Sequence, residues 1–409
     1  MIVLNNKPTK NLTILILVAA LGYFVDIYDL LLFLIIKNKS LISIGVNDAD
    51  LASTGLYLMN WQMAGLLTGG VFWGILGDKK GRLSVLFGSI ILYSLANIAN
   101  GFVQDVPTYA ALRFIAGIGL AGELGAGITL VSESMTAKNR GYGTMIIASV
   151  GLTGAVVAYY ISNIFEWRTT FFIGGGLGLL LLLLRFNVLE STLFNKISTD
   201  SSSKGNFFKL FSPLSRSKKY IYCILIAVPV WFVVGILIGL APQFGKALNM
   251  VGIPDTGRGI MFAYIGIAIG DFVTGFLSQY FKSRKKIVFS FIVLTYLAIL
   301  FFLFSNQLTV SSFYKLCFAF GFSTGYWVVF VTIASEQFGT NLRATVTTSV
   351  PNFVRGSLIP VSALFTFTAS HIGLVNSALV VGSLTILLAL FALYNLPETY
   401  GKELDYIEK

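Results

Sequence analysis

The sequence has few charged residues for its length. Of 409 residues, 11% are charged and 56% are hydrophobic, whereas roughly 25% of residues are charged in a typical soluble domain. A soluble core cannot hide that much apolar surface while so few charges remain outside it. The composition therefore excludes a water-soluble chain and predicts a membrane protein.

Cysteine and histidine are nearly absent. The two cysteines, Cys223 and Cys317, lie inside apolar runs, which argues against a disulfide framework. The single histidine, His371, lies in a short connection, which argues against a His-based metal site. The sequence also shows no phosphate-binding loop and no nucleophile constellation. We therefore expect no metal, no cofactor and no enzymatic activity.

Long hydrophobic segments are what the sequence has instead. A membrane-spanning helix needs about 20 mainly apolar residues. The first apolar run is not followed by a small-residue cleavage site, so it is expected to remain as the first membrane helix. Twelve segments are long enough, and an even number of spans places both termini on one side of the membrane. The segments are 11–36, 52–76, 84–103, 106–131, 142–164, 168–188, 220–245, 258–281, 287–306, 309–335, 344–369 and 373–395.

Basic residues indicate the orientation of these segments. Of the 29 Lys and Arg residues, 21 lie on the side of the termini, Arg185 among them, and 6 lie on the other side, including Lys37 and Lys39. Arg113 and Arg355 lie within predicted helices. Because cytoplasmic loops carry the excess of Lys and Arg, both termini are predicted to be cytoplasmic, in an inner or plasma membrane. Topology then explains the net charge of +11, and we expect no nucleic-acid partner.

The two halves of the chain resemble each other. Residues 74–78 and 275–279 share a pattern at an offset of 201. A Ser-Glu pair followed by Arg seven residues after the Glu also occurs twice, at an offset of 203: Ser132, Glu133 and Arg140, then Ser335, Glu336 and Arg343. Such self-similarity indicates repeated structural units. We predict an all-α membrane protein with two six-helix pseudo-repeats, residues 1–188 and 220–409, joined by a cytoplasmic linker over residues 189–219.

Several motifs resemble those of the major facilitator superfamily of transporters. Residues 74–82, GILGDKKGR, are similar to the signature of that family between its second and third helices. Residues 113–119 resemble its motif on the fourth helix, and Trp167-Arg168 resembles a common opening of the sixth. The resemblance implies two six-helix bundles that give alternating access to a central site. It also implies gating charges at the cytoplasmic helix ends, namely Asp78, Arg82, Glu133, Arg140, Glu336 and Arg343.

Two further motifs resemble particular branches of this superfamily. Residues 26–29, DIYD, are similar to an element of the metabolite and aromatic-acid proton symporters. Residues 397–399, PET, resemble the ending of the sugar porters. The chain departs from the usual pattern at Gln279, where an Asp is common, and at Ser283, which replaces a glycine. These departures put a fully symmetrical gating network in doubt.

Three charged residues are predicted to share the outer third of the membrane. At about 1.5 Å per residue, a helix over residues 11–36 places Asp26 and Asp29 at the depth of Arg113. The two aspartates lie on one helix face, so they compete for one guanidinium. Release of Arg113 by protonation suits a proton symporter, and we predict that Asp29 carries the proton with Asp26 as a helper. The alternative is a static salt bridge between the first and fourth helices.

A second charged set is predicted to lie deeper. Asp271 and Arg355 are expected to meet near the midplane, and Glu123 lies at a similar level with no obvious partner in its own half. Because such transporters bind substrate at the midplane between repeats, these residues are predicted substrate contacts, and a purely structural pair of Asp271 with Arg355 is the alternative. Further candidates for lining the site, with helix packing as the alternative, are Gln62, Trp327 and Asn352.

The sequence favours a proton-coupled transporter that imports a small polar metabolite by alternating access. Two acids and one Arg suit an amino acid or an organic acid. A proton-driven exporter of a siderophore or drug-like molecule and a sugar symporter are the alternatives on the same fold, whereas the short tails argue against a sensor or scaffold. The expected partners are the substrate, protons and the bilayer, and the protein is expected to be monomeric.

Overall fold

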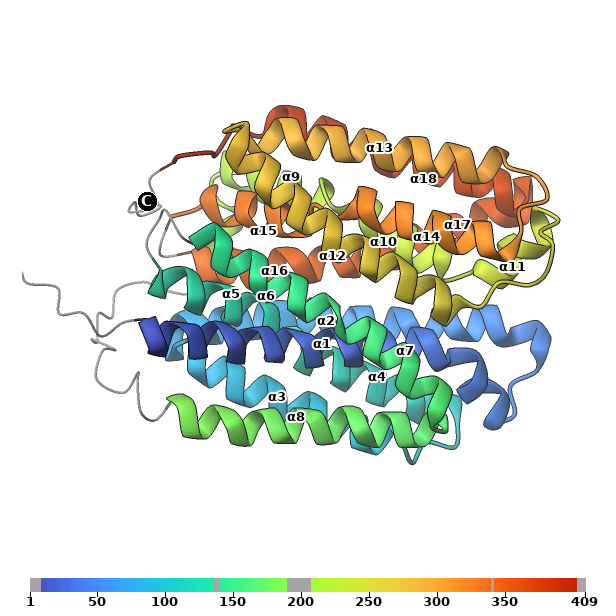
Figure 1. Cartoon of the computed structure of the whole chain (residues 1–409), viewed down its shortest axis with the longest axis horizontal. Coiled ribbons are helices and arrows are strands. Elements are labelled where there is room, and N and C mark those ends of the chain that lie inside the picture. Colours follow the sequence, from blue (N-terminus) through green and yellow to red (C-terminus); the bar gives the residue numbers. More distant parts are fainter. Residues whose placement is uncertain (1–8, 136–139, 190–206, 340–341, 403–409) are drawn as a thin grey trace, which may run out of the picture.

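The computed structural model describes residues 9–135, 140–189, 207–339 and 342–402 (Figure 1). These residues are almost entirely helical, and within them the only β structure is an isolated bridge between Val251 and Thr309. In a bilayer every backbone N–H and C=O must find a partner inside the protein, and a helix satisfies its own. The prediction of an all-α membrane protein is confirmed.

The N-terminal helices are α1 to α8. Helices α4 and α5 form one span, as do α6 and α7. Asp105 caps α4 by accepting a hydrogen bond from Thr108 N at 2.8 Å, and Pro107 lies in the first turn of that helix. The bounds are α1 (Thr9–Ser43), α2 (Leu51–Lys80), α3 (Arg82–Asn100), α4 (Val106–Leu120), α5 (Glu123–Ser134), α6 (Arg140–Leu152), α7 (Gly154–Ile164) and α8 (Trp167–Leu189).

The C-terminal helices are α9 to α18. The seventh span is divided into four pieces that include η3, a π-helical turn, and the tenth is interrupted after Thr324. The bounds are α9 (Leu214–Leu225), α10 (Val228–Phe232), η3 (Val233–Ile238), α11 (Ala241–Ala247), α12 (Thr256–Tyr280), α13 (Arg284–Phe304), α14 (Val310–Thr324), α15 (Trp327–Glu336), α16 (Arg343–Gly356), α17 (Leu358–Ile372) and α18 (Leu374–Asn395).

The helices agree with the twelve predicted spans, with one important difference. Within the described residues, ten helical segments are long and apolar enough to cross a membrane. The other two predicted spans are occupied by α2 and by α3, whose described apolar part is Ser84–Asn100. The difference is α1, which continues to Ser43, whereas the prediction ended it at residue 36. Lys37 therefore lies inside this helix.

The two groups of helices lie side by side along the long axis of the molecule. The N-terminal helices, blue to green, fill the lower half of Figure 1, and the C-terminal helices, yellow to red, fill the upper half. We call the end at which α1 begins the inner end and the opposite end the outer end. The predicted linker over residues 189–219 lies partly outside the described residues, since these omit residues 190–206.

Small residues let the two groups approach closely. A Cβ on Gly74 of α2 would lie 3.3 Å from Thr345 Cα near the inner end, a spacing typical of small-residue contacts between membrane helices. In the middle, Asn352 Nδ2 donates to Ala121 O at 2.8 Å. Nearer the outer end, Asn60 Nδ2 donates to Ser362 Oγ at 3.1 Å. The groups therefore meet at three levels.

Candidate functional site

An ion pair joins the two groups of helices at mid-depth. Asp26 is the central residue of α1, and its Oδ2 lies 3.7 Å from Nη2 of Arg355 on α16. Both side chains are buried, with exposures of 0% and 2%. The sequence prediction paired these residues differently, Asp26 with Arg113 and Arg355 with Asp271. It was wrong because a helix ending at residue 36 puts Asp26 too near the outer end.

Arg355 has few other partners. Its Nη1 donates to Asn352 Oδ1 at 3.3 Å, and its guanidinium carbon lies 5.8 Å from the centre of the Trp327 ring. Arg355 Nε, Trp327 Nε1 and both carboxylate oxygens of Asp26 have no hydrogen-bond partner within the described structure. Tyr23 and Tyr264 lie in the electrostatic field of the pair.

We call Tyr23, Asp26, Tyr264, Trp327 and Arg355 the central cluster. Buried polar atoms are nearly always hydrogen-bonded, so several orphaned atoms in one place need a reason. They supply donors and acceptors that a polar ligand could satisfy, and the three aromatic rings supply an apolar surface beside them. The cluster therefore has the chemistry of a small-molecule site.

Asp29 and Arg113 lie within the N-terminal group. Arg113 Nη2 donates to Asn97 Oδ1 at 2.9 Å, and its Nε donates to Asn100 Oδ1 at 3.3 Å. The guanidinium also lies over the rings of Phe33 and Phe171. Asp29 lies in the field of Arg113, but among the described residues no ion pair joins them. Arg113 is thus held by amides and aromatic rings of its own group.

Glu123 has a partner that the sequence analysis missed. Arg185 Nη1 donates to Glu123 Oε2 at 3.1 Å, Nη2 contacts Oε1, and each side chain is 1% exposed. The prediction counted Arg185 with the cytoplasmic flank, although it falls at the end of the apolar segment 168–188. Gly22 makes room for the pair, because a Cβ there would collide with Glu123 Oε1 and Arg185 Nη2. Glu123 is therefore part of a salt bridge within the N-terminal group.

The remaining predicted substrate contacts hydrogen-bond to the backbone of neighbouring helices. Asp271 Oδ1 accepts from Val328 N at 3.1 Å, so it contacts the start of α15 and forms no pair with Arg355. Gln62 Nε2 donates to Leu30 O at 3.2 Å, a contact between α2 and α1. Asn352 bridges to Ala121 and also contacts Arg355. Among these three, Asn352 is the residue whose side chain hydrogen-bonds to a side chain of the central cluster.

Comparison with known proteins agrees with this architecture. A profile of the Major Facilitator Superfamily matches residues 12–361. The chain belongs to this superfamily. The resemblance inferred from the motifs is thereby confirmed.

Several relatives of this chain are named as transporters. It is 24% identical over 404 residues to a probable 4-methylmuconolactone transporter of Cupriavidus pinatubonensis, covering 94% of this chain and 90% of that protein. It is 27% identical to a putative metabolite transport protein of Haemophilus influenzae, covering 95% and 96%. It is also 27% identical to the 3-(3-hydroxy-phenyl)propionate transporter of Escherichia coli, covering 71% of each. The chain is a multi-pass membrane transporter of small metabolites.

The inner end of this major facilitator protein carries a charge network in its C-terminal group. Arg284 Nε lies 2.7 Å from Glu336 Oε2, and Glu398 accepts from Ser283 Oγ at 2.5 Å and Arg284 N at 3.0 Å. Partial burial acts to raise the pKa of Glu398, but these and further backbone hydrogen bonds outweigh it and hold the pKa below 4.5. Of the predicted gating residues, Arg343 Nε donates to Ser335 O at 3.4 Å, and four have side chains outside the described structure: Asp78, Arg82, Glu133 and Arg140.

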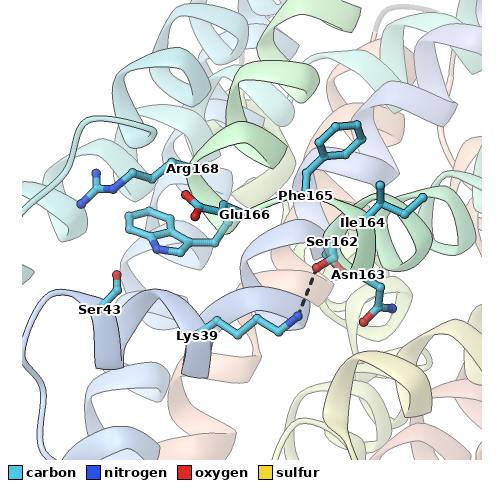
Figure 2. Close-up of a pocket in the computed structure, with 9 residues that line it drawn as sticks. Lys39, Ser43, Ser162, Asn163, Ile164, Phe165, Glu166 and Arg168 are labelled. Atoms are coloured by element: carbon cyan, nitrogen blue, oxygen red, sulfur yellow. Dashed lines mark hydrogen bonds between the residues drawn. The ribbon is translucent and has the colours of Figure 1, made fainter.

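The outer end of this transporter shows two features. Lys37, 5% exposed, donates from Nζ to Gly239 O at 2.6 Å and so joins α1 to the residue that follows η3. A hollow of about 590 Å³ lies nearby (Figure 2), where Lys39 Nζ donates to Ser162 O at 3.1 Å. None of the predicted site residues lines this hollow. The candidate site is therefore the sealed central cluster.

Proposed function

We propose that this transporter imports a small organic acid together with a proton across an inner or plasma membrane, with both termini cytoplasmic. The observation that best supports the proposal is the buried ion pair between Asp26 and Arg355, which joins the two groups of helices. Substrate sites in such folds lie near the midplane where the repeats meet. Arginine is the side chain best suited to a carboxylate, which it binds through two parallel hydrogen bonds.

Charge balance links the proton to the acid. With Asp26 ionised and the site empty, the cluster is neutral. With Asp26 protonated and a carboxylate on Arg355, it is neutral again. A proton alone or an anion alone would leave one uncompensated charge at a depth where such a charge costs several kcal/mol. The site therefore favours passage of the proton and the acid together.

The aromatic rings of the central cluster support a substrate with an apolar body. Trp327 lies beside Arg355, and Tyr23 and Tyr264 lie near the same pair. A flat apolar group next to a bound carboxylate would rest on these rings, because ligand sites combine apolar walls with a few polar groups. The name of the Escherichia coli relative specifies a phenylpropionate, which fits this chemistry.

Import follows from coupling to the proton gradient of such a membrane, which is directed inward. The partners we propose are the acid, protons and the bilayer, with no nucleic acid. A single chain supplies every residue of the cluster, so a monomer is sufficient for transport.

The test uses proteoliposomes with an imposed inward proton gradient. Labelled 3-phenylpropionate should accumulate, and glucose should not. Asp26→Asn should sharply reduce this accumulation but retain exchange of 3-phenylpropionate between the two faces, because exchange moves no net proton. Arg355→Met should abolish both.

Asp29→Asn is the comparison variant, since it removes the same charge three residues along the same helix. We expect it to retain gradient-driven uptake. The proposal fails if glucose accumulates and the acid does not, or if Asp26→Asn takes up the acid as the unmodified protein does.

A further inference from the structure

Charges inside the described part of the membrane region are almost fully balanced. Asp26 pairs with Arg355 and Glu123 with Arg185, while Asp29 lies in the field of Arg113. Among the described residues, neither Asp29 nor Asp271 has a Lys or Arg nitrogen within ion-pair distance, but Asp29 lies in the field of Arg113, whereas no basic side chain acts on Asp271 in this way.

Asp271 lies where a membrane helix is interrupted. Helix α12 packs against the break between α14 and α15, and a Cβ on Gly325 would lie 2.6 Å from Gly270 Cα. Thr274 Oγ1 donates to Gly325 O at 2.8 Å. One turn of α12 thus holds both sides of the break.

The carboxyl group of Asp271 is only half used. Its Oδ1 accepts from Val328 N, whereas its Oδ2 has no hydrogen-bond partner, and the side chain is 0% exposed. The positive end of a helix such as α15 amounts to about half an elementary charge, which balances a carboxylate only in part. Helix α1 is one of the elements packed against this part of α12. Its described titratable group near Asp271 is Tyr23, which is neutral.

A proton is the cation that fits this site. It needs one oxygen, and Oδ2 is free to take it. A metal cation needs several oxygen ligands, and no group of three acidic, His or Cys side chains occurs in the described structure.

We propose that Asp271 is a second proton-binding site, so that two protons accompany each organic anion, one on Asp26 and one on Asp271. This inference rests on the proposed function. The step forms one O–H bond at Asp271 Oδ2 as the proton arrives from one face and breaks it as the proton leaves to the other. Asp271 accepts from the backbone at the start of α15, and Trp327, the first residue of that helix, carries the ring over which the Arg355 guanidinium lies.

The inference predicts that transport carries charge. Two protons and one monovalent anion move one net positive charge inward, whereas one proton and one anion move none. At a pH difference of one unit without a membrane potential, two protons support about 100-fold accumulation and one proton about tenfold.

The experiment measures uptake of 3-phenylpropionate into proteoliposomes under a membrane potential, negative inside, without a pH gradient. The unmodified protein should accumulate the acid. Asp271→Asn should not respond to the potential, although its pH-driven accumulation should persist and fall from about 100-fold to about tenfold at one pH unit. Asn keeps an oxygen that accepts from Val328 N, so the contact with α15 survives, and Asp271→Ser is a second neutral variant.

Thr274→Val is the matched control. It removes the hydrogen bond to Gly325 at the same helix break but no ionisable group, so the response to the potential should remain.

Three results would overturn the second proton site. They are a lack of response to the potential in the unmodified protein, a retained response in Asp271→Asn, and uptake driven by a sodium gradient in place of protons. Absence of any pH-driven uptake in the unmodified protein would instead refute the proposed function, so the two failures are distinguishable.

Discussion

Removing one partner of the Glu123–Arg185 pair should strongly destabilise the protein. The perturbations are Glu123→Gln, Arg185→Gln and the combination of both. Each single change leaves the other group charged at 1% exposure, and breaking a buried pair in this way costs about 3–5 kcal/mol. With the unfolding entropy per residue of globular proteins, this corresponds to a fall in Tm of about 4–6 °C for a chain of this length.

The double variant should be more stable than the sum of the single effects. With both charges gone, two amides of similar size can bond to each other between α5 and α8. We expect a coupling free energy of at least about 2 kcal/mol between the positions, which is within the range for residues in direct contact.

Thermal unfolding of the purified protein, followed by tryptophan fluorescence, measures these changes. Glu166→Gln is the control, because Glu166 is exposed and its loss should cost less than about 0.5 kcal/mol. Additive losses of Tm in the double variant, or an unchanged Tm in Glu123→Gln, would refute the reasoning. Measuring uptake by the same variants distinguishes a structural role of Glu123 from a role in substrate binding. If Glu123 contacted substrate, the double variant would regain stability without regaining transport.

Lys37→Met should slow uptake several-fold, whereas Lys37→Arg should not. Closing the outer end buries this ammonium against a single carbonyl, Gly239 O. The hydrogen bond contributes about 1.5–3 kcal/mol, which is less than the cost of burying the charge, so the lysine favours reopening. An apolar side chain has no such cost and should hold the outer end closed; unchanged initial rates of uptake would contradict this. Glu398→Gln should lower Tm at pH 7, and the difference in Tm should shrink as the pH falls below 4.5. Hydrogen bonds hold the pKa of Glu398 below 4.5, so their contribution is present above the unfolded value and is lost as the pH falls through the folded value. A difference in Tm that does not shrink with falling pH would count against it.

The sequence was sufficient to predict the fold. Apolar segment length and the distribution of Lys and Arg depend on the bilayer, which acts on every segment alike, and the predicted segments coincide with helices. The predicted end of α1 is wrong because a lysine directly after an apolar run is typical of a residue that flanks a membrane helix. Lys37 is instead a buried lysine that bonds to a carbonyl of the other group, and nothing in the local sequence distinguishes these two situations.

The set of candidate residues was also largely accessible from the sequence, but their pairing was not. A charge inside an apolar segment is visible in the sequence, and Asp26 and Arg355 were both found in this way. Which charges meet depends on helix depth and rotation. Seven residues at the end of α1 correspond to about 10 Å along the helix axis, enough to assign Asp26 to the wrong arginine. The same reliance on segment ends hid Arg185, the partner of Glu123.

For the two buried ion pairs, the position relative to the two groups of helices decides which pair the proposed transport cycle can separate. Alternating access rocks one group of helices against the other. Glu123 and Arg185 both belong to the N-terminal group, so rocking leaves their distance unchanged. Asp26 and Arg355 belong to different groups, so in the proposed cycle their separation would change, and each would then need another counter-charge or would have to lose its own charge. A proton on Asp26 and a carboxylate on Arg355 meet both requirements.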